Sequence, residues 1–312
     1  MSKREGSALT GLNVTFEKEF QDFTRSARMV VLTILILLTA GTSIYVAAKT
    51  MKNYVDNDSF MLLTLFTSSS NPVPSFLSLM SFLVPLTGIA LGFDTISKEF
   101  QERTLGRILS QPIYRDVLLF GKALGALVSM ALILLSLWLL VIGSAMLFLG
   151  VPPTGEQIGR ALVFLLITLL YGVLWFTIAM WFSIIFRQGA TSALVCIAVW
   201  LFFLIFWPII SQLLAVGIGG GNQILSARLY SVLSRFSPYM LYSQASIAML
   251  SPTTRSLGVV LFYQMQGALG GTPLPFGQSL LLIWPQLTSF IAAIIVVFTF
   301  GYVKFQRMEI RM

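Results

Sequence analysis

The sequence predicts an all-α membrane protein that crosses the bilayer six times. Hydrophobic residues make up 56% of the 312-residue chain, charged residues make up only 10%, and the apolar residues gather in long uncharged runs. A soluble domain carries about 25% charged residues, so this composition excludes an ordinary soluble fold. A run of about 20 apolar residues is long enough to cross the hydrocarbon core as a helix.

Six runs meet this length, and each is interpreted as one transmembrane helix. The predicted spans are 29–48, 75–96, 118–149, 161–186, 190–216 and 280–303. The third would be about 48 Å long as a helix, which exceeds the bilayer core, so we expect it to tilt or to extend beyond the membrane. Pro85 lies inside the second span and Pro208 near the end of the fifth, where a kink or a break is expected.

An amphipathic helix is predicted within the N-terminal segment 1–28, directly before the first span. Phe16, Phe20 and Phe23 recur at spacings of four and three residues, which places them on one helical face. Polar and charged side chains, among them Arg25 and Arg28, occupy the opposite face. Such a helix lies in the headgroup layer, so membrane lipid is an expected contact.

A short charged stretch separates the second and third spans. Residues 97–111 are predicted to form one helix, with Ser97 suited to the N-cap and Pro112 disfavouring helix at the residue before it. Its apolar side consists of Phe100, Thr104, Leu105, Ile108 and Leu109. Glu99 and Arg103 have the spacing of an i,i+4 ion pair. The pattern alone also fits a solvated helix at the lipid surface.

Three motifs surround this helix. They are Phe93-Asp94-Thr95-Ile96-Ser97-Lys98-Glu99, then Thr104-Leu105 followed by Leu109-Ser110-Gln111-Pro112-Ile113-Tyr114-Arg115, and finally Gly121-Lys122. Together with Phe236-Ser237-Pro238 and the ending 275–311, they make the chain resemble type-2 ABC transporter permeases. The resemblance is greatest to the branch that includes the maturation permeases of nitrous oxide reductase.

The resemblance implies roles for particular residues. In that family this loop contains the coupling helix, which docks in a groove of a partner ATPase. The residues expected to take part are Asp94, Glu99, Phe100, Arg103, Thr104, Leu105, Ile108, Leu109 and Arg115. The amphipathic helix before the first span corresponds to the elbow helix of the family. Two permease copies are expected to assemble with two copies of a cytoplasmic ATPase.

The longest connection, residues 217–279, follows the fifth span. The glycines between 217 and 221 end the helical pattern. One helical face is then formed by Leu225, Leu229, Val232, Leu233 and Phe236. Ser237-Pro238 suits the beginning of a second helix, which ends near Pro252. We expect two short amphipathic helices at the outer surface, and a charged tail, 304–312, after the sixth span.

Lysine and arginine are distributed unequally between the two sides of the predicted bundle. Fourteen lie in the N-terminal segment, in the loop that holds the coupling helix and its continuation to Lys122, at Arg187 and in the tail. Only Lys49, Lys52 and Arg160 lie in the short loops of the other side. The positive-inside rule then predicts that both termini and the coupling helix lie in the cytoplasm. The expected location of the protein is the cell membrane.

Several chemistries are excluded by the residues that are present. The chain has no histidine, and its single cysteine, Cys196, permits neither an intrachain disulfide nor a metal site made of thiolates. Gly121-Lys122 resembles the centre of a phosphate loop, but Asp116 and Ala123 stand at the positions of its first Gly and its Ser/Thr. We therefore expect no catalysis and no cofactor in this chain, with ATP and Mg²⁺ on the partner ATPase. The net charge of +8 requires no nucleic acid.

The resemblance implies the permease subunit of an ABC exporter. Polar residues suited to line a pathway are Thr39, Thr42, Ser43, Thr87 and Ser192, although small polar residues serve helix packing equally well. The mostly apolar spans mildly favour a lipid-like or amphiphilic cargo. Two alternatives stay open: an ATP-driven machine that acts on an outer partner protein in metalloenzyme maturation, and a secondary carrier.

Overall fold

The computed structural model describes residues 11–52, 60–69, 73–104, 106, 114–150, 152–254 and 273–308. Regular secondary structure in these ranges is helical, and six helical segments are long and apolar enough to cross a membrane. They are α2 (Ala27–Lys52), α4 (Phe76–Gly92) together with the residues that follow it up to Gln101, α7 (Arg115–Leu149), α8 (Gly155–Ile185), the continuous path α9–η1–α10 (Gly189–Gly219) and α14 (Phe276–Gln306). The predicted fold class is confirmed.

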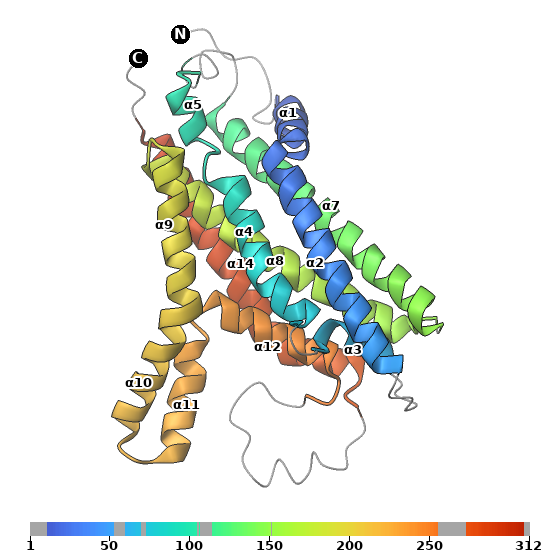
Figure 1. Ribbon diagram of the computed structural model, residues 1–312. Coiled ribbons are helices and arrows are strands. Elements are labelled where there is room, and N and C mark those ends of the chain that lie inside the picture. The colour runs from blue at the N-terminus through green and yellow to red at the C-terminus, as the bar shows by residue number, and fades with distance from the viewer. Residues whose placement is uncertain are drawn as a thin grey trace.

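The long helices extend between two ends of the molecule, named here the α5 end and the α12 end (Figure 1). The α5 end contains α1 (Leu12–Arg25) and α5 (Ser97–Gln101). The α12 end contains α3 (Met61–Thr67) and α12 (Pro238–Leu250), and a hairpin of α10 and α11 (Gln223–Ser234) projects beyond it. Both described chain ends therefore lie on the same side of the bundle.

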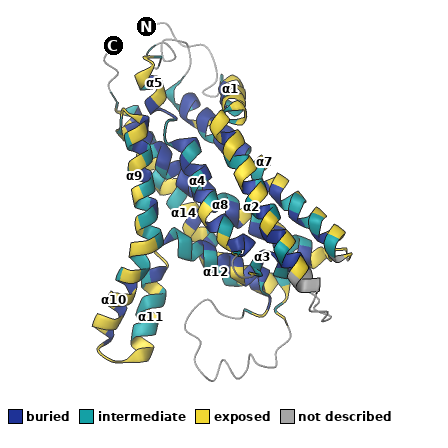
Figure 2. Ribbon diagram, in the orientation of Figure 1, coloured by how far each residue is buried: buried dark blue, intermediate teal, exposed yellow. Residues whose placement is uncertain are grey.

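The core is centred on α8, which has buried residues along its whole length (Figure 2). Two glycines let α4 pack directly on it. A Cβ atom added to Gly88 would lie 2.5 Å from the carbonyl oxygen of Gly172, and one added to Gly92 would lie 2.6 Å from that of Phe176. Because these distances are too short for any side chain, α4 and α8 are in backbone contact.

Large apolar side chains cover the outer surfaces of the long helices. Examples are Leu38 on α2, Leu147 on α7, Leu213 on α10 and Leu281 on α14, all of which are exposed. Exposed apolar area of this extent marks a surface that lipid or another protein covers. The bundle is thus apolar both inside and outside, as a membrane-embedded protein requires.

The spans begin and end in polar turns that the hydropathy pattern does not include. α8 begins at Gly155 rather than 161, because the Thr154 hydroxyl accepts from the N–H of Gln157 and the Gln157 side chain accepts from the N–H of Thr154. α4 ends at Gly92 rather than 96, since the Thr95 hydroxyl donates to the carbonyls of Leu91 and Gly92. Capping groups therefore decide these boundaries.

Neither proline breaks its span. Pro85 lies inside α4, and Pro208 is the second residue of α10, directly after a π-helical turn, η1 (Phe202–Phe206). In π geometry the N–H of residue 208 would bond the carbonyl of Phe203, but proline has no N–H. Ser237 Oγ donates to that carbonyl instead, at 2.9 Å. The break expected at Pro208 is thus a π turn with its free carbonyl satisfied.

Residues 61–67 lie between the first two predicted spans and form the helix α3, which the sequence analysis does not predict. Leu63, Leu65 and Phe66 of α3 are buried, and the ring of Phe66 meets those of Phe76 and Phe164 edge-on at 5.4 Å. The apolar run is only about two turns long, too short to be recognised by a span-length criterion. α3 closes the core at the α12 end.

The two helices expected after the fifth span exist, but only one lies on the surface. α11 runs back along α10, and Trp207 Nε1 donates to the carbonyl of Leu233 at 2.9 Å (Figure 1). α12 was predicted to be an amphipathic surface helix. Instead Tyr242, Ala245 and Met249 are fully buried against α8 and α14. Residues 238–250 contain no charged side chain, so α12 has no face that requires water.

Arg160 joins the helices at the α12 end. Its side chain is 0% exposed, and it donates to Glu156 Oε1 at 2.8 Å, to Ser279 Oγ at 3.0 Å and to the carbonyl of Leu274 at 2.5 Å. It also lies 5.7 Å from the ring centroid of Phe60. The sequence analysis placed Arg160 in a short loop. In the structure Arg160 is buried and connects α8, α14 and the segment before α14.

Candidate functional site

α5 is fixed to the bundle by a serine from another helix. The N–H groups of Ile96 and Ser97 donate to Ser183 Oγ of α8 at 2.9 and 3.0 Å. These donors begin a helix and have no partner within it, so they need an acceptor from elsewhere. Ser97 was predicted to be this N-cap. In the structure Ser97 is the first helical residue and α8 supplies the acceptor.

α5 is shorter than the helix predicted for residues 97–111. It ends at Gln101, because Arg103 has a left-handed backbone with φ of 54° and the N–H of Thr104 donates to the carbonyl of Glu99. Phe100 is half-buried and packs against the core. Leu105, Ile108 and Leu109, the rest of the predicted apolar face, lie outside the described residues. A single uninterrupted helical face therefore does not extend from Phe100 past Arg103.

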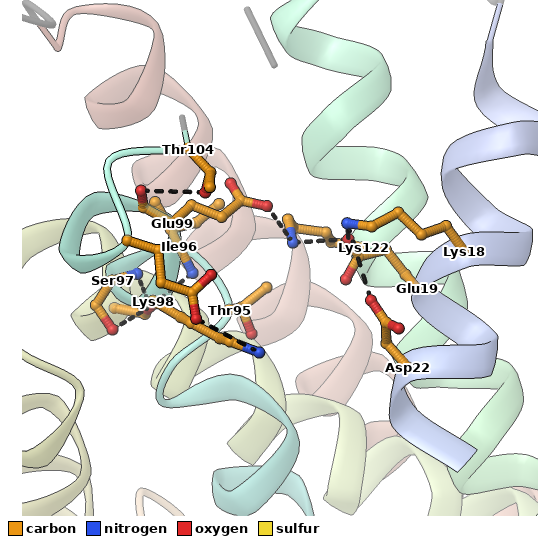
Figure 3. A network of polar contacts seen from close by, with 12 residues as sticks. Lys18, Glu19, Asp22, Thr95, Ile96, Ser97, Lys98, Glu99, Thr104 and Lys122 are labelled. Carbon is orange, nitrogen blue, oxygen red and sulfur yellow. Dashed lines mark hydrogen bonds and ion pairs between the residues drawn. The ribbon is translucent and has the colours of Figure 1, made fainter. Parts of the chain in front are cut away.

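A buried ionic cluster connects α5 to two other helices (Figure 3). Lys122 Nζ of α7 lies 2.8 Å from Glu19 Oε1 of α1 and 2.8 Å from Glu99 Oε1 of α5. The three side chains are only 5%, 6% and 9% exposed. The Glu99–Arg103 ion pair expected from sequence is thus replaced by a long-range pair between Glu99 and Lys122.

The cluster continues toward the surface. Lys18, which is 58% exposed, lies 3.2 Å from Glu19 and 3.8 Å from Asp22. Charges therefore alternate in sign from Lys18 through Glu19 and Lys122 to Glu99. Buried charges of this kind are tolerated only when they are paired, and removing one partner costs about 3–5 kcal/mol. We name Glu19, Glu99 and Lys122 the buried triad.

α1 reaches the triad because α7 has two glycines one turn apart. A Cβ atom added to Gly121 would lie 2.6 Å from Thr15 Cγ2, and one added to Gly125 would lie 3.0 Å from the Cβ of Glu19. Small residues spaced by four allow two helices to approach this closely. Gly121-Lys122 thus provides the helix contact and the cation together.

The predicted elbow helix divides into two parts. α1 ends at Arg25, Ser26 has an extended backbone, and the Ser26 hydroxyl accepts from the N–H of Met29 in the first turn of α2. Phe16, Phe20 and Phe23 are half-buried. Arg28, which was expected in the same helix, belongs to α2.

Arg28 connects α2 to the turn between α4 and α5. Its guanidinium group lies 2.6 Å from Asp94 Oδ2 and 4.9 Å from the ring centroid of Phe93. Asp94, an expected docking residue, is therefore bound within the chain. The pair is partly exposed, so its contribution to stability is small, and its role is to fix the position of the turn before α5.

Arg115 and Asp116 bind the last turns of α14. Arg115 Nη1 donates to the carbonyls of Gln306 and Met308 at 3.2 and 3.0 Å, and Asp116 accepts from the Tyr302 hydroxyl at 3.0 Å and from the Gln306 side chain. A cation is favourable at a helix C-terminus, where carbonyl groups lack partners. Arg115, another expected docking residue, thus joins α7 to α14.

Sequence reasoning missed both the partner of Lys122 and the role of Ser183. Glu19 is one of several charged residues on α1, and the sequence does not distinguish it from the others. One signal was available: the spacing of Gly121 and Gly125 around a lysine in an otherwise apolar span indicates a close helix contact and a buried cation. The described residues contain no group of three His, Cys, Asp or Glu side chains placed to hold a metal ion.

The five residues suggested for a pathway lie on three helices. The hydroxyls of Thr39, Thr42 and Thr87 donate to carbonyls four residues earlier in their own helices, and Ser43 donates to the carbonyl of Pro74. Ser192 is buried without a partner among the described residues. These bonds fit the packing interpretation, and a pathway along these residues stays a prediction.

The fold and the charged α5 end define a polytopic membrane protein in which short helices are fixed to the end of a bundle. The model of the ABC-2 family transporter proteins matches residues 14–310, and the chain belongs to this family. The resemblance inferred from the motifs is thereby confirmed.

Two curated relatives carry the same name, "Probable ABC transporter permease protein NosY". The one from Pseudomonas aeruginosa is 33% identical over 181 residues, which cover 57% of this chain and 63% of the relative. The one from Stutzerimonas stutzeri is 30% identical over 165 residues, which cover 51% of this chain and 58% of the relative. The matched region spans less than two thirds of either relative.

Proposed function

We propose that the chain is the membrane subunit of an ABC exporter, which moves a substrate across the cell membrane with ATP and Mg²⁺ bound on a separate ATPase. Family membership supports a transporter subunit. The observation that carries the proposal is the fixation of α5. Its beginning is held by Ser183 of α8 and its middle by Lys122 of α7, so a push on α5 reaches two long helices directly.

Two copies of the ATPase and a second copy of this chain are the expected partners. The path α9–η1–α10 has few buried residues and large exposed apolar ones such as Ile209 and Leu213. Such an apolar surface can be covered by lipid or by another permease subunit. The proposal places α5 and both termini in the cytoplasm, because the lysine and arginine count favours that side.

The proposed orientation predicts which positions an impermeant thiol reagent reaches in intact cells. Single cysteines are introduced at Ser2 and at Thr254 in a Cys196→Ser background. We expect labelling at position 254 and none at position 2 until the cells are permeabilised. Labelling of position 2 in intact cells, with position 254 protected, would reverse the orientation.

Docking of the ATPase is tested by a charge on the segment that follows α5. Leu105→Asp would bury an unpaired carboxylate at the interface, which costs several kcal/mol and lowers the affinity by a factor of about 100 or more. We expect this variant to lose the co-purified ATPase and its ATP turnover.

Gln101→Asp is the matched control, since Gln101 is exposed on α5 and a carboxylate there stays hydrated. It should retain the ATPase. If Gln101→Asp releases the ATPase and Leu105→Asp does not, docking uses the exposed side of α5. If both variants retain it, α5 and its continuation are not the docking element.

A second candidate function is an ATP-driven machine that acts on an outer partner protein in metalloenzyme maturation. The observation that favours it is the α10–α11 hairpin, which projects beyond α12 (Figure 1) and exposes Val216, Ile218 and Ile224. An apolar projection of this kind suits a protein contact. Family membership, in turn, favours either ATP-driven machine over a secondary carrier.

A further inference from the structure

A cavity of about 340 Å³ lies at the α12 end, between the beginning of α4, the end of α3 and one side of α12. Eight of its ten lining residues carry a hydroxyl group, and none carries a charge. α4 contributes Ser78 and Ser81, and α12 contributes Tyr239, Tyr242 and Ser243. Small-molecule sites begin at about 300 Å³, so the space accommodates a ligand of modest size.

The hydroxyl groups are only partly used by the protein. Ser81 Oγ donates to the carbonyl of Ser78 at 2.6 Å, and the Tyr242 hydroxyl lies 3.3 Å from that of Thr168. The side chains of Tyr239 and Ser243 make no hydrogen bond to the described residues. Each hydroxyl offers one donor and two acceptor positions, so the cavity presents free donors and free acceptors side by side.

The wall of the cavity is held rigid by aromatic packing. The rings of Tyr171 and Tyr242 stack with centroids 4.5 Å apart, and the Tyr171 hydroxyl donates to the carbonyl of Ser81 at 3.2 Å. These contacts join α8, α12 and α4 around the cavity. A preformed wall loses little conformational entropy when a ligand binds, which favours a specific site.

Neither of the two cavities beside α12 has a charged lining residue. A second cavity, of about 740 Å³, lies between α12 and the α10–α11 hairpin, and shares Ile247 with the first. Its polar lining consists of uncharged groups such as Gln212, Gln244 and Tyr230. An ion entering either cavity would lose hydration without gaining a counter-charge, whereas an acyl chain would leave the hydroxyls without partners.

We propose that the hydroxyl-lined cavity binds a small uncharged solute rich in hydroxyl groups, of the monosaccharide or polyol class. Such a solute both donates and accepts hydrogen bonds, as the lining does, and its ring can lie against the tyrosine side chains. This class differs from the lipid-like cargo that the apolar spans favour. The binding itself does not depend on an ATPase, so it is tested on the chain alone.

The experiment measures binding to the full chain in lipid nanodiscs by saturation-transfer NMR. The probes are glucose and myo-inositol, compared with gluconate and glucosamine as anionic and cationic molecules of similar size. We expect the two uncharged probes to bind more tightly than either ion. Tyr239→Phe combined with Ser243→Ala removes two hydroxyls and little volume, and should raise the Kd of glucose about tenfold or more.

The matched control combines Tyr45→Phe with Ser289→Ala, which removes the same two groups from exposed positions on α2 and α14. It should bind glucose as the unmodified chain does. The proposal is overturned if gluconate or glucosamine binds as tightly as glucose, if the cavity variant keeps the original Kd, or if neither uncharged probe binds.

Discussion

Replacement of Lys122 by methionine is expected to destabilise the α5 end by about 3–5 kcal/mol, because two buried carboxylates, Glu19 and Glu99, lose their shared cation. Methionine keeps most of the side-chain volume, so the loss reports charge and not a cavity. The measurement is the free energy of unfolding in detergent, together with the rate at which protease cleaves the chain near Ser26, where α1 ends.

Two comparisons separate the triad from a general effect of charge. Lys18→Met removes an exposed lysine that contacts the same Glu19, and should cost at most about 1 kcal/mol. The triple variant Glu19→Gln, Glu99→Gln, Lys122→Met removes the buried charges together and should recover much of the loss. If Lys122→Met is as stable as Lys18→Met, the triad does not hold α1 and α5 on α7.

Replacement of Arg160 by methionine is expected to loosen the α12 end, with a loss of about 3 kcal/mol or more. The Leu274 carbonyl and the Ser279 hydroxyl each lose a charged hydrogen-bond donor, and the pair with Glu156 is lost as well. Hydrogen exchange should become faster in the first turns of α14 and at the end of α12, while the α5 end stays protected.

Arg228→Met is the matched control, because Arg228 is exposed on α11 and should change the free energy of unfolding by no more than about 0.5 kcal/mol. Arg160→Lys keeps the charge but offers a point donor in place of a planar fork, so it should restore part of the stability. Equal stability of Arg160→Met and Arg228→Met would mean that the contacts of Arg160 contribute nothing measurable.

Much of the fold follows from local sequence. Each span is an apolar run whose length is set by the bilayer, and Ser237-Pro238 correctly indicated the beginning of α12. What local sequence leaves out is the environment of each helix. Whether α12 lies on the surface or inside depends on α8 and α14, and whether α3 is a helix depends on the pocket that receives Phe66.

The candidate site was harder to predict. The sequence does not distinguish a charged residue that contacts a partner protein from one that contacts another helix of the same chain. Asp94, Glu99 and Arg115 were assigned to docking, and all three bind other helices of the same chain. The left-handed Arg103 was also beyond prediction, because helical spacing continues through it. Only the three-dimensional structure shows which residues these side chains contact.

The π turn at Phe202–Phe206 changes the azimuth of the fifth span. One additional residue in a helical turn rotates everything after it by about 100° around the axis. The face of α9 that contacts α8 and the face of α10 that contacts α11 are therefore offset by this additional rotation. The continuous helix α9–η1–α10 therefore packs against α8 and α11 with two faces that point in different directions. The one inserted residue sets the angle between these two faces.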